Sequence, residues 1–306
     1  MEDDVYARGR VLAAQHRIAD WFASFMAFAR ERDATSAWRP QLNPVPPHKL
    51  RHDSEQRAYQ QQAGIAAGLG LHIEGGARLN GPAVNPANST DAARQWHGAA
   101  PQIAVIDDFL TPAALDALRR HCWGSDVWQQ SFADGYVGAF PEHGFAAPLL
   151  AQIAEELRSV FGEICGDHPL KYVWAFKYDS ELRGIGVHAD EAAVNVNFWI
   201  TPDEANLDPE SGGLVIWDKA APLDWDFSRY NSDVAAIRDF LEQSGARKRV
   251  VPYRANRAVI FDSDLFHQTD NIHFRPGYLN RRINVTMLYG DRHTGTTGSE
   301  DRAGAL

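Results

Sequence analysis

The chain has little cysteine, no long apolar run and no excess of positive charge. Its two cysteines, Cys122 and Cys165, form no CxxC pair, so they can build neither a zinc knuckle nor a disulfide framework. No run of about 18 apolar residues occurs, and we therefore expect no membrane span. The acidic start Met1-Glu2-Asp3-Asp4 does not resemble a secretory signal. We accordingly expect a cytoplasmic protein with buried free thiols.

The charge balance argues against a nucleic-acid partner. Lys and Arg total 30 against 40 Asp and Glu, a formal charge of −10, and an acidic chain repels phosphate backbones at long range. Hydrophobic residues make up 44% of the 306 residues, which excludes global disorder. The composition leaves small molecules, amino acids and polypeptides as partners.

Residues 1–100 are predicted to form an N-terminal helical and loop extension. Residues 5–32 have helical spacing and carry an aromatic stripe that we expect to pack on the main domain, or on a second copy in a homodimer. A proline-rich connector follows, then a short helix over residues 53–67 with Asp53 as its N-cap, and a long loop over residues 70–100. The stripe consists of Trp21, Phe22, Phe25 and Phe28.

The pattern changes at residue 101, where we expect a single domain that extends to residue 306. A short strand over 103–106 is followed by a helix with Thr111 as its cap and Pro112 at its first position. A second helix is predicted over 146–165 and a third over 231–243. Short strands separated by turns indicate an α+β domain built on a β-sandwich or barrel. The strands are predicted over 171–178, 194–200, 213–217, 249–253, 257–262 and 282–289.

Three residues in this domain have the pattern of a metal site. His188 and Asp190 are alternate residues of an extended segment, so their side chains point to the same side. His267 follows an apolar strand 79 residues later and supplies a third ligand. Two histidines and one carboxylate form the facial triad that holds Fe(II) in non-haem oxygenases and leaves positions open for a cosubstrate and O₂.

A later strand offers a partner for an organic acid. By alternation, Arg282, Asn284 and Thr286 share one face, which we expect to line the barrel, while the apolar residues between them pack under helices. A buried guanidinium there would match a dicarboxylate, although a structural ion pair explains it as well. Arg281 takes the role if the register is shifted by one residue. Asn195 and Asn197 share one face of a predicted strand and contact either a cosubstrate or metal-bound water, or only a structural hydrogen-bond partner.

Together these motifs resemble the 2-oxoglutarate/Fe(II) oxygenase superfamily, and in particular its prolyl-4-hydroxylase-like branch. The resemblance covers about residues 101–290 and includes Gly212-Gly213-Leu214 before a middle strand. It implies a double-stranded β-helix, or jelly roll, with supporting helices. It also implies that Fe(II), 2-oxoglutarate and O₂ are used to hydroxylate a C–H bond of a small molecule, amino acid or peptide, with release of succinate and CO₂.

The same resemblance implies roles for further residues. Tyr178 corresponds to a tyrosine that bonds the cosubstrate carboxylate. The presence of Asp190 favours hydroxylation over halogenation, because related halogenases lack this carboxylate. The chain departs from compact members of the family by a surplus over residues 218–248, which is either a lid or a surface elaboration. Two alternatives stay open: a cupin-like metal enzyme that does not use 2-oxoglutarate, and a non-catalytic binding module.

Overall fold

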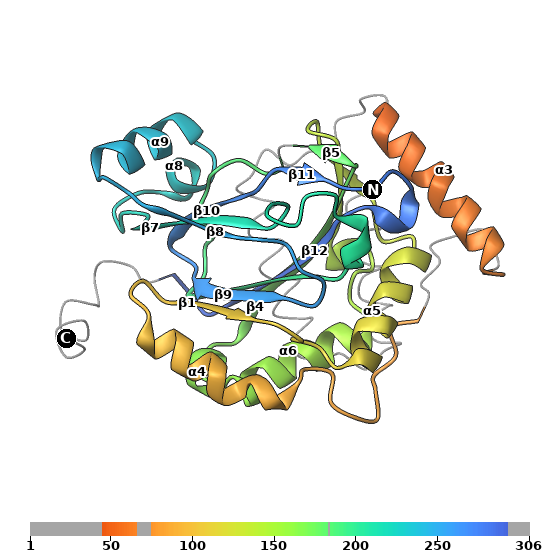
Figure 1. The fold of residues 1–306 in the computed structure, drawn as a ribbon, viewed down its shortest axis with the longest axis horizontal. Coiled ribbons are helices and arrows are strands. Elements are labelled where there is room, and N and C mark those ends of the chain that lie inside the picture. Colours follow the sequence, from red (N-terminus) through yellow and green to blue (C-terminus); the bar gives the residue numbers. More distant parts are fainter. Residues whose placement is uncertain (1–44, 66–74, 183, 293–306) are drawn as a thin grey trace.

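The computed structural model describes residues 45–65, 75–182 and 184–292, and its centre is a pair of facing β-sheets (Figure 1). The larger sheet has seven strands in the order β1-β9-β6-β12-β4-β3-β2, and the smaller has the order β10-β7-β8. A two-stranded ribbon, β11-β5, lies at one end. The strands are β1 (Ile103–Ile106), β2 (Gln130–Ser131), β3 (Tyr136–Ala139), β4 (Leu170–Tyr178), β5 (Glu181–Leu182), β6 (Val194–Trp199), β7 (Leu214–Ala220), β8 (Lys248–Val251), β9 (Ala258–Asp262), β10 (Leu265–Thr269), β11 (Ile272–His273) and β12 (Ile283–Tyr289).

The chain alternates between the two sheets as it winds around the barrel. After β4 in the larger sheet, the extended segment around His188 pairs with β10 at the edge of the smaller sheet. The chain then passes to β6 (large), β7 and β8 (small), β9 (large), β10 (small) and β12 (large). This winding is the double-stranded β-helix, or jelly roll, and the predicted fold is confirmed.

Strand alternation divides the larger sheet into an inner and an outer face. On β12, the apolar residues Ile283, Val285 and Met287 join a core formed with the helices beneath the sheet. Asn284 and Thr286 lie on the opposite face, in register with Trp199 and Asn197 of β6. The predicted assignment of the two faces is therefore correct, and the polar face of β12 points into the barrel.

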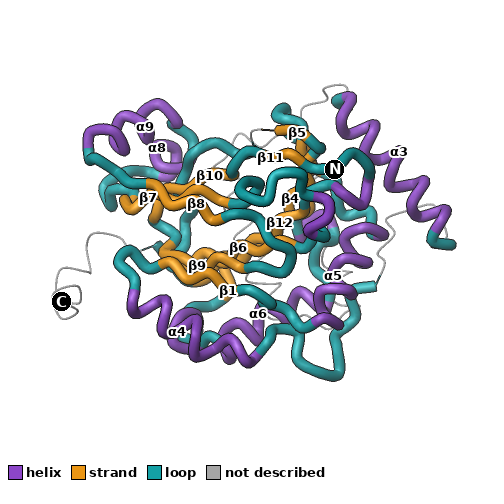
Figure 2. Tube along the Cα trace, in the orientation of Figure 1, coloured by secondary structure: helices purple, strands orange, loops and turns teal. Residues whose placement is uncertain are grey.

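Helices cover the outer face of the larger sheet. They are α4 (Ser89–Gly98), α5 (Pro112–Gly124), α6 (Pro148–Val160) and α7 (Gly162–Cys165), which Figure 2 shows in purple along that side. Thr111 caps α5 as predicted by accepting from the N–H of Ala114, and Pro112 starts the helix. Gln95 of α4 covers the sheet edge, because its side chain bonds both the N–H and the carbonyl of Val105.

The helix α3 (Pro47–Gln62) docks on the core through polar rather than apolar side chains. Gln60 donates to the carbonyl of Gly124, at the end of α5, and Gln56 donates to the carbonyl of Ser125, the next residue. The last carbonyls of a helix lack partners within it. These contacts supply partners for the carbonyls at the end of α5, as do Nζ of Lys177 on the carbonyl of Cys122 and the Tyr278 hydroxyl on the carbonyl of Trp123.

Three predictions about the helices need correction. The helix predicted over 53–67 begins at Pro47, with Pro46 as its cap, so the prolines start this helix instead of preventing it. The predicted loop over 70–100 contains α4, in which Ala92 is the buried residue and Trp96 packs partly on the core, so few apolar positions indicate a helix. The predicted helix over 146–165 is broken at Phe161, whose backbone is not helical. The predicted insert over 231–243 is confirmed as α9 (Val234–Gln243), preceded by α8 (Phe227–Asn231).

Other predictions concern parts of the chain outside the described residues. The N-terminal helix over 5–32, with its aromatic stripe and the expected homodimer, falls there and stays a prediction. The domain boundary at residue 100 lies within the described residues, and it also stays a prediction. No helix in the described ranges has the length and apolar character needed to cross a membrane.

A buried histidine in α3 makes stability sensitive to acid. The His52 ring is fully buried against the rings of Trp128 and Tyr278. Burial lowers its pKa to about 3, and this outweighs the raising effect of the hydrogen bond to Asp53. Because an unfolded histidine titrates near 6.5, the unfolded state binds more protons between pH 6.5 and 3, and stability falls as the pH falls through that window.

We expect His52 alone to lower the free energy of unfolding by about 2 kcal/mol when the pH falls from 7 to 5. His52→Phe should remove that contribution while it preserves an aromatic ring. Urea unfolding of both proteins at pH 7 and pH 5 checks this. Equal losses of stability in the two proteins would show that His52 does not titrate in this way.

Candidate metal centre

The backbone of the smaller sheet brings the three predicted metal ligands together. His188 and His267 exchange both of their backbone hydrogen bonds, at 2.9 and 2.8 Å. The segment around His188 thus continues the smaller sheet beyond β10. His267 lies inside β10, a strand that sequence analysis did not predict. The register of the pair places both imidazoles on the same side.

The three side chains converge on one point. One ligand atom from each of His188, Asp190 and His267 lies within 4.8 Å of the others. The Nε2 of His188 is 3.8 Å from Oδ1 of Asp190, and the Nε2 of His267 is 3.5 Å from Oδ2 of the same carboxylate. In the described part of the chain this is the one such cluster of histidine, cysteine and carboxylate side chains.

Backbone carbonyls set the tautomer of both histidines. The Nδ1 of His188 lies 2.8 Å from the carbonyl of Gly186, and the Nδ1 of His267 lies 3.0 Å from the carbonyl of Leu265. A carbonyl only accepts, so each Nδ1 carries the proton and each Nε2 keeps its lone pair. Burial, together with the neighbouring His267, lowers the pKa of His188 to about 4. His188 is thus neutral near pH 7, as a metal ligand must be.

Asp190 is oriented by a neighbour on the larger sheet. The Nδ2 of Asn195 donates to Oδ2 of Asp190 at 2.8 Å, and both residues are buried. This contact leaves Oδ1 of the carboxylate directed toward His188. Asn195 and Asn197 are alternate residues of β6 that sequence analysis singled out together, and the structure places Asn195 beside Asp190.

The donor set fits Fe(II). Two imidazole nitrogens and a carboxylate on one side of a point form the 2-His-1-carboxylate arrangement, which leaves coordination positions open. A closed structural zinc site would need a fourth protein ligand. No other histidine, cysteine or carboxylate joins this cluster among the residues with described positions.

Arg282 lies on the inner face of the barrel and is almost completely buried, with 1% of its surface exposed. Its Nε donates to the carbonyl of Gly212 at 2.6 Å and its Nη2 to the carbonyl of Gly213 at 3.2 Å. These contacts explain the Gly-Gly-Leu turn that the sequence displays. The guanidinium also lies over the Tyr178 ring, 5.0 Å from its centroid.

The guanidinium of Arg282 retains an unused donor. Its Nη1 is buried and has no hydrogen-bond partner, and no salt bridge joins Arg282 to a carboxylate in the described ranges. Burial lowers the pKa of Arg282, yet a guanidinium stays charged near neutral pH. A buried cation without a carboxylate partner is costly. The site is therefore suited to an anionic ligand.

The other predicted cosubstrate residues surround a single hydroxyl group. Asn284 and Asn197 both donate to Oγ1 of Thr286, at 3.0 and 3.1 Å. The Oδ1 of Asn197 is buried without a partner, as are Oδ1 of Asn195 and Nε1 of Trp199. Because Asn195, Asn197 and Trp199 are alternate residues of β6, they share its inner face. Sequence analysis did not single out Trp199, since a tryptophan in a strand also suits a core.

Gly213 supports this region because it has no side chain. A Cβ at this position would lie 1.9 Å from the carbonyl oxygen of Val251 on β8. Gly213→Ala is expected to destabilise the protein by about 1–3 kcal/mol through overpacking. Gly98→Ala is the matched control, because no atom lies within 4 Å of its Cβ position. Thermal melting of both variants checks this, and equal melting temperatures would contradict it.

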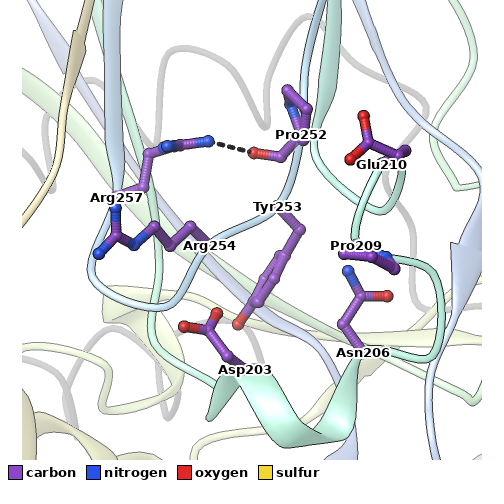
Figure 3. A pocket seen from close by; sticks show the side chains of 8 residues that line it. All are labelled: Asp203, Asn206, Pro209, Glu210, Pro252, Tyr253, Arg254 and Arg257. Atoms are coloured by element: carbon purple, nitrogen blue, oxygen red, sulfur yellow. Dashed lines mark hydrogen bonds between the residues drawn. The ribbon is translucent and has the colours of Figure 1, made fainter.

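A separate hollow of about 290 Å³ lies beside the turn between β8 and β9 (Figure 3). Its two arginines, Arg254 and Arg257, both form salt bridges with Asp107. Arg257 also donates to the carbonyl of Pro252, the dashed contact in Figure 3. Tyr253 donates to the carbonyl of Thr201. The arginines and the tyrosine of this hollow are thus already paired within the protein, unlike Nη1 of Arg282.

No family model and no curated protein matches the sequence. The fold is similar to several solved structures at low identity. An α-ketoglutarate-dependent epimerase from nogalamycin biosynthesis, SnoN, is 13% identical, with a TM-score of 0.48 over 70% of this chain and 89% of that one. A member of the 2OG-Fe(II) oxygenase family from Burkholderia pseudomallei is 13% identical, with a TM-score of 0.41 over 72% and 94%. A Pseudomonas putida prolyl-4-hydroxylase is 15% identical, with a TM-score of 0.39 over 68% and 99%.

These structures include the class of protein that the sequence resembles, the 2-oxoglutarate/Fe(II) oxygenases. At such identities the likeness concerns the fold alone. What this chain does has to be argued from its own residues.

Proposed function

We propose that this protein is an Fe(II)- and 2-oxoglutarate-dependent dioxygenase that hydroxylates a C–H bond. The observation that carries the proposal is a pair of features inside one barrel. A convergent His188, Asp190 and His267 cluster lies in the smaller sheet, and Arg282 presents a buried donor without a partner on the inner face of the larger sheet. A metal site alone would also suit a cupin-like enzyme, but such an enzyme would have no need of Arg282.

Each side chain has a role in this proposal. The Nε2 atoms of His188 and His267 and the carboxylate of Asp190 would hold the iron. The bound iron supplies the activation of O₂ that is coupled to oxidative decarboxylation of 2-oxoglutarate to succinate and CO₂. Arg282 would bind one carboxylate of the cosubstrate through its free Nη1. Tyr178, whose ring lies against the guanidinium, would fix its plane.

The polar residues of β6 and β12 would complete the cosubstrate site. The Thr286 hydroxyl accepts hydrogen bonds from the side-chain amides of Asn197 and Asn284, and this network is buried. The same hydroxyl can still donate its own O–H to a cosubstrate oxygen. We propose that these three side chains orient the cosubstrate between Arg282 and the metal.

Aromatic side chains supply a wall for the primary substrate. Phe176 and Trp174 of β4 are in register with Asn284 and Thr286, so they lie on the same inner face. Phe176 and Phe132 are partly exposed and pack edge to face, and Tyr136 stacks on Phe132. We propose that a small molecule, amino acid or peptide with an apolar or ring-bearing part lies against this wall.

Turnover of the cosubstrate tests the proposal without knowledge of the primary substrate. The full chain, loaded with Fe(II), is incubated with 2-oxoglutarate in air, and succinate and CO₂ are measured. We expect slow formation of both products in equal amounts, and none without Fe(II) or without O₂. No succinate above the metal-free background would overturn the proposal and would favour a metal enzyme with another cosubstrate.

A further inference from the structure

The segment that carries two of the proposed metal ligands has two faces with different surroundings. His188 and Asp190 point toward the metal cluster. The alternate residues Val187 and Ala189 are fully buried in a separate apolar cluster on the other side. This second cluster is formed with the insertion between β7 and β8, which contains α8 and α9.

The insertion packs tightly on the back of the metal-binding segment. Tyr230, Ile237 and Leu241 of α8 and α9 are buried beside Ala189 and Phe266. Phe266 is the neighbour of the third ligand, His267. The apolar face of the insertion therefore covers the backs of both ligand-bearing segments.

A buried arginine fixes the start of the insertion. Arg292 forms a 2.5 Å salt bridge with Asp264, in the turn before β10. Its Nη2 also donates to the carbonyls of Ala221 and Pro222, and its guanidinium lies over the Tyr230 ring at 4.1 Å. The insertion is thus tied to the barrel by charge, hydrogen bonds and packing together. These contacts would have to break for the insertion to move as a lid, and they therefore favour a fixed insertion.

Both backbone groups of Ala189 bond to α8. Its N–H donates to the carbonyl of Tyr230 at 2.9 Å, and its carbonyl accepts from Nδ2 of Asn231, also at 2.9 Å. Ala189 is the residue between His188 and Asp190, so its two peptide units connect the ligands. A rotation of either peptide would turn one ligand away from the other.

We propose that the α8–α9 insertion is a fixed support for the metal centre, and that Asn231 is a positioning residue for His188 and Asp190. The inference rests on the proposed function, since it assigns the insertion a role at that same metal site. Asn231 does not belong to the metal cluster, and it acts through the Ala189 carbonyl. Outer partners of metal ligands change metal affinity by about 10- to 100-fold when removed.

The test compares substitutions at two positions of the same insertion. Asn231→Ala removes the donor to Ala189, and Asn231→Asp replaces it with an acceptor of the same shape. Asp233→Ala is the control, because Asp233 caps α9 through the N–H of Ala236 and does not contact the metal-binding segment. Loss of that cap weakens the insertion without changing the bonds of Ala189.

The readouts are the Co(II) dissociation constant and the visible Co(II) spectrum of each full-length protein, with melting temperatures measured alongside. Both Asn231 variants should raise the dissociation constant about tenfold or more and change the spectrum. Asp233→Ala should lower the melting temperature but leave both metal readouts as in the wild type. Unchanged metal readouts in the Asn231 variants, or the same change in Asp233→Ala, would overturn the positioning role. A wild-type protein that binds no Co(II) would overturn the proposed function itself, and the positioning role with it.

Discussion

His188→Ala, Asp190→Ala and His267→Ala are each expected to abolish 2-oxoglutarate turnover and to weaken Fe(II) binding by more than about 100-fold. Loss of a residue that only orients a metal ligand costs about 10- to 100-fold in affinity, so loss of a ligand itself should exceed that range. The three ligand atoms lie within 4.8 Å of one another. Because the cluster contains only these three ligands, none of its members can replace one that is removed.

Anaerobic Fe(II) titration and succinate formation measure the two effects separately. His97→Ala serves as the control, because His97 is exposed on α4 and pairs only with Glu163 at the surface. Normal turnover in any one of the triad variants would remove that residue from the site. A loss of activity in His97→Ala as well would point to a general loss of folding.

Arg282→Ala is expected to raise the KM for 2-oxoglutarate by roughly two orders of magnitude, because a charge-assisted hydrogen bond from the buried Nη1 to a carboxylate is worth a few kcal/mol. Arg282→Lys should restore only part of this affinity. A lysine keeps the charge but lacks the planar fork, which also donates to the carbonyls of Gly212 and Gly213. Fe(II) binding should be affected far less than cosubstrate binding in both variants.

Arg281 is a matched control at the adjacent position. Its guanidinium pairs with Glu55 at 2.9 Å and Asp179 at 3.3 Å, so its charge is already satisfied. Arg281→Ala should leave the KM for 2-oxoglutarate unchanged. An unchanged KM in Arg282→Ala with a raised KM in Arg281→Ala would transfer the anion-binding role to Arg281. Steady-state kinetics of succinate formation distinguish these outcomes.

The sequence predicted the barrel well where a simple period governs the structure. β9 was located as a continuous apolar run before a turn, and alternation of polar and apolar residues assigned the two faces of β12. The same alternation placed His188 beside Asp190, and Arg282 in line with Asn284. These are local relations, which neighbours in the chain determine.

Relations between distant segments were not predictable in this way. The strand β10 reads Leu-Phe-His-Gln-Thr and has no clear period, because its two faces meet the metal cluster and the insertion. The helix α4 is held by the bonds of Gln95 to a strand edge, and the start of α3 by a proline cap. Ala189, the hydrogen-bond partner of Asn231, lies 42 residues away in the sequence, and a local sequence pattern cannot predict such a contact.

The most direct test of the central claim is the absorption spectrum of the Fe(II) protein after anaerobic addition of 2-oxoglutarate. If iron binds His188, Asp190 and His267 and the cosubstrate reaches the same metal, a metal-to-ligand charge-transfer band should appear only when both are present. Arg282→Ala should require a much higher 2-oxoglutarate concentration for the same band. A wild-type protein that binds Fe(II) but shows no such band at saturating 2-oxoglutarate would contradict the assignment.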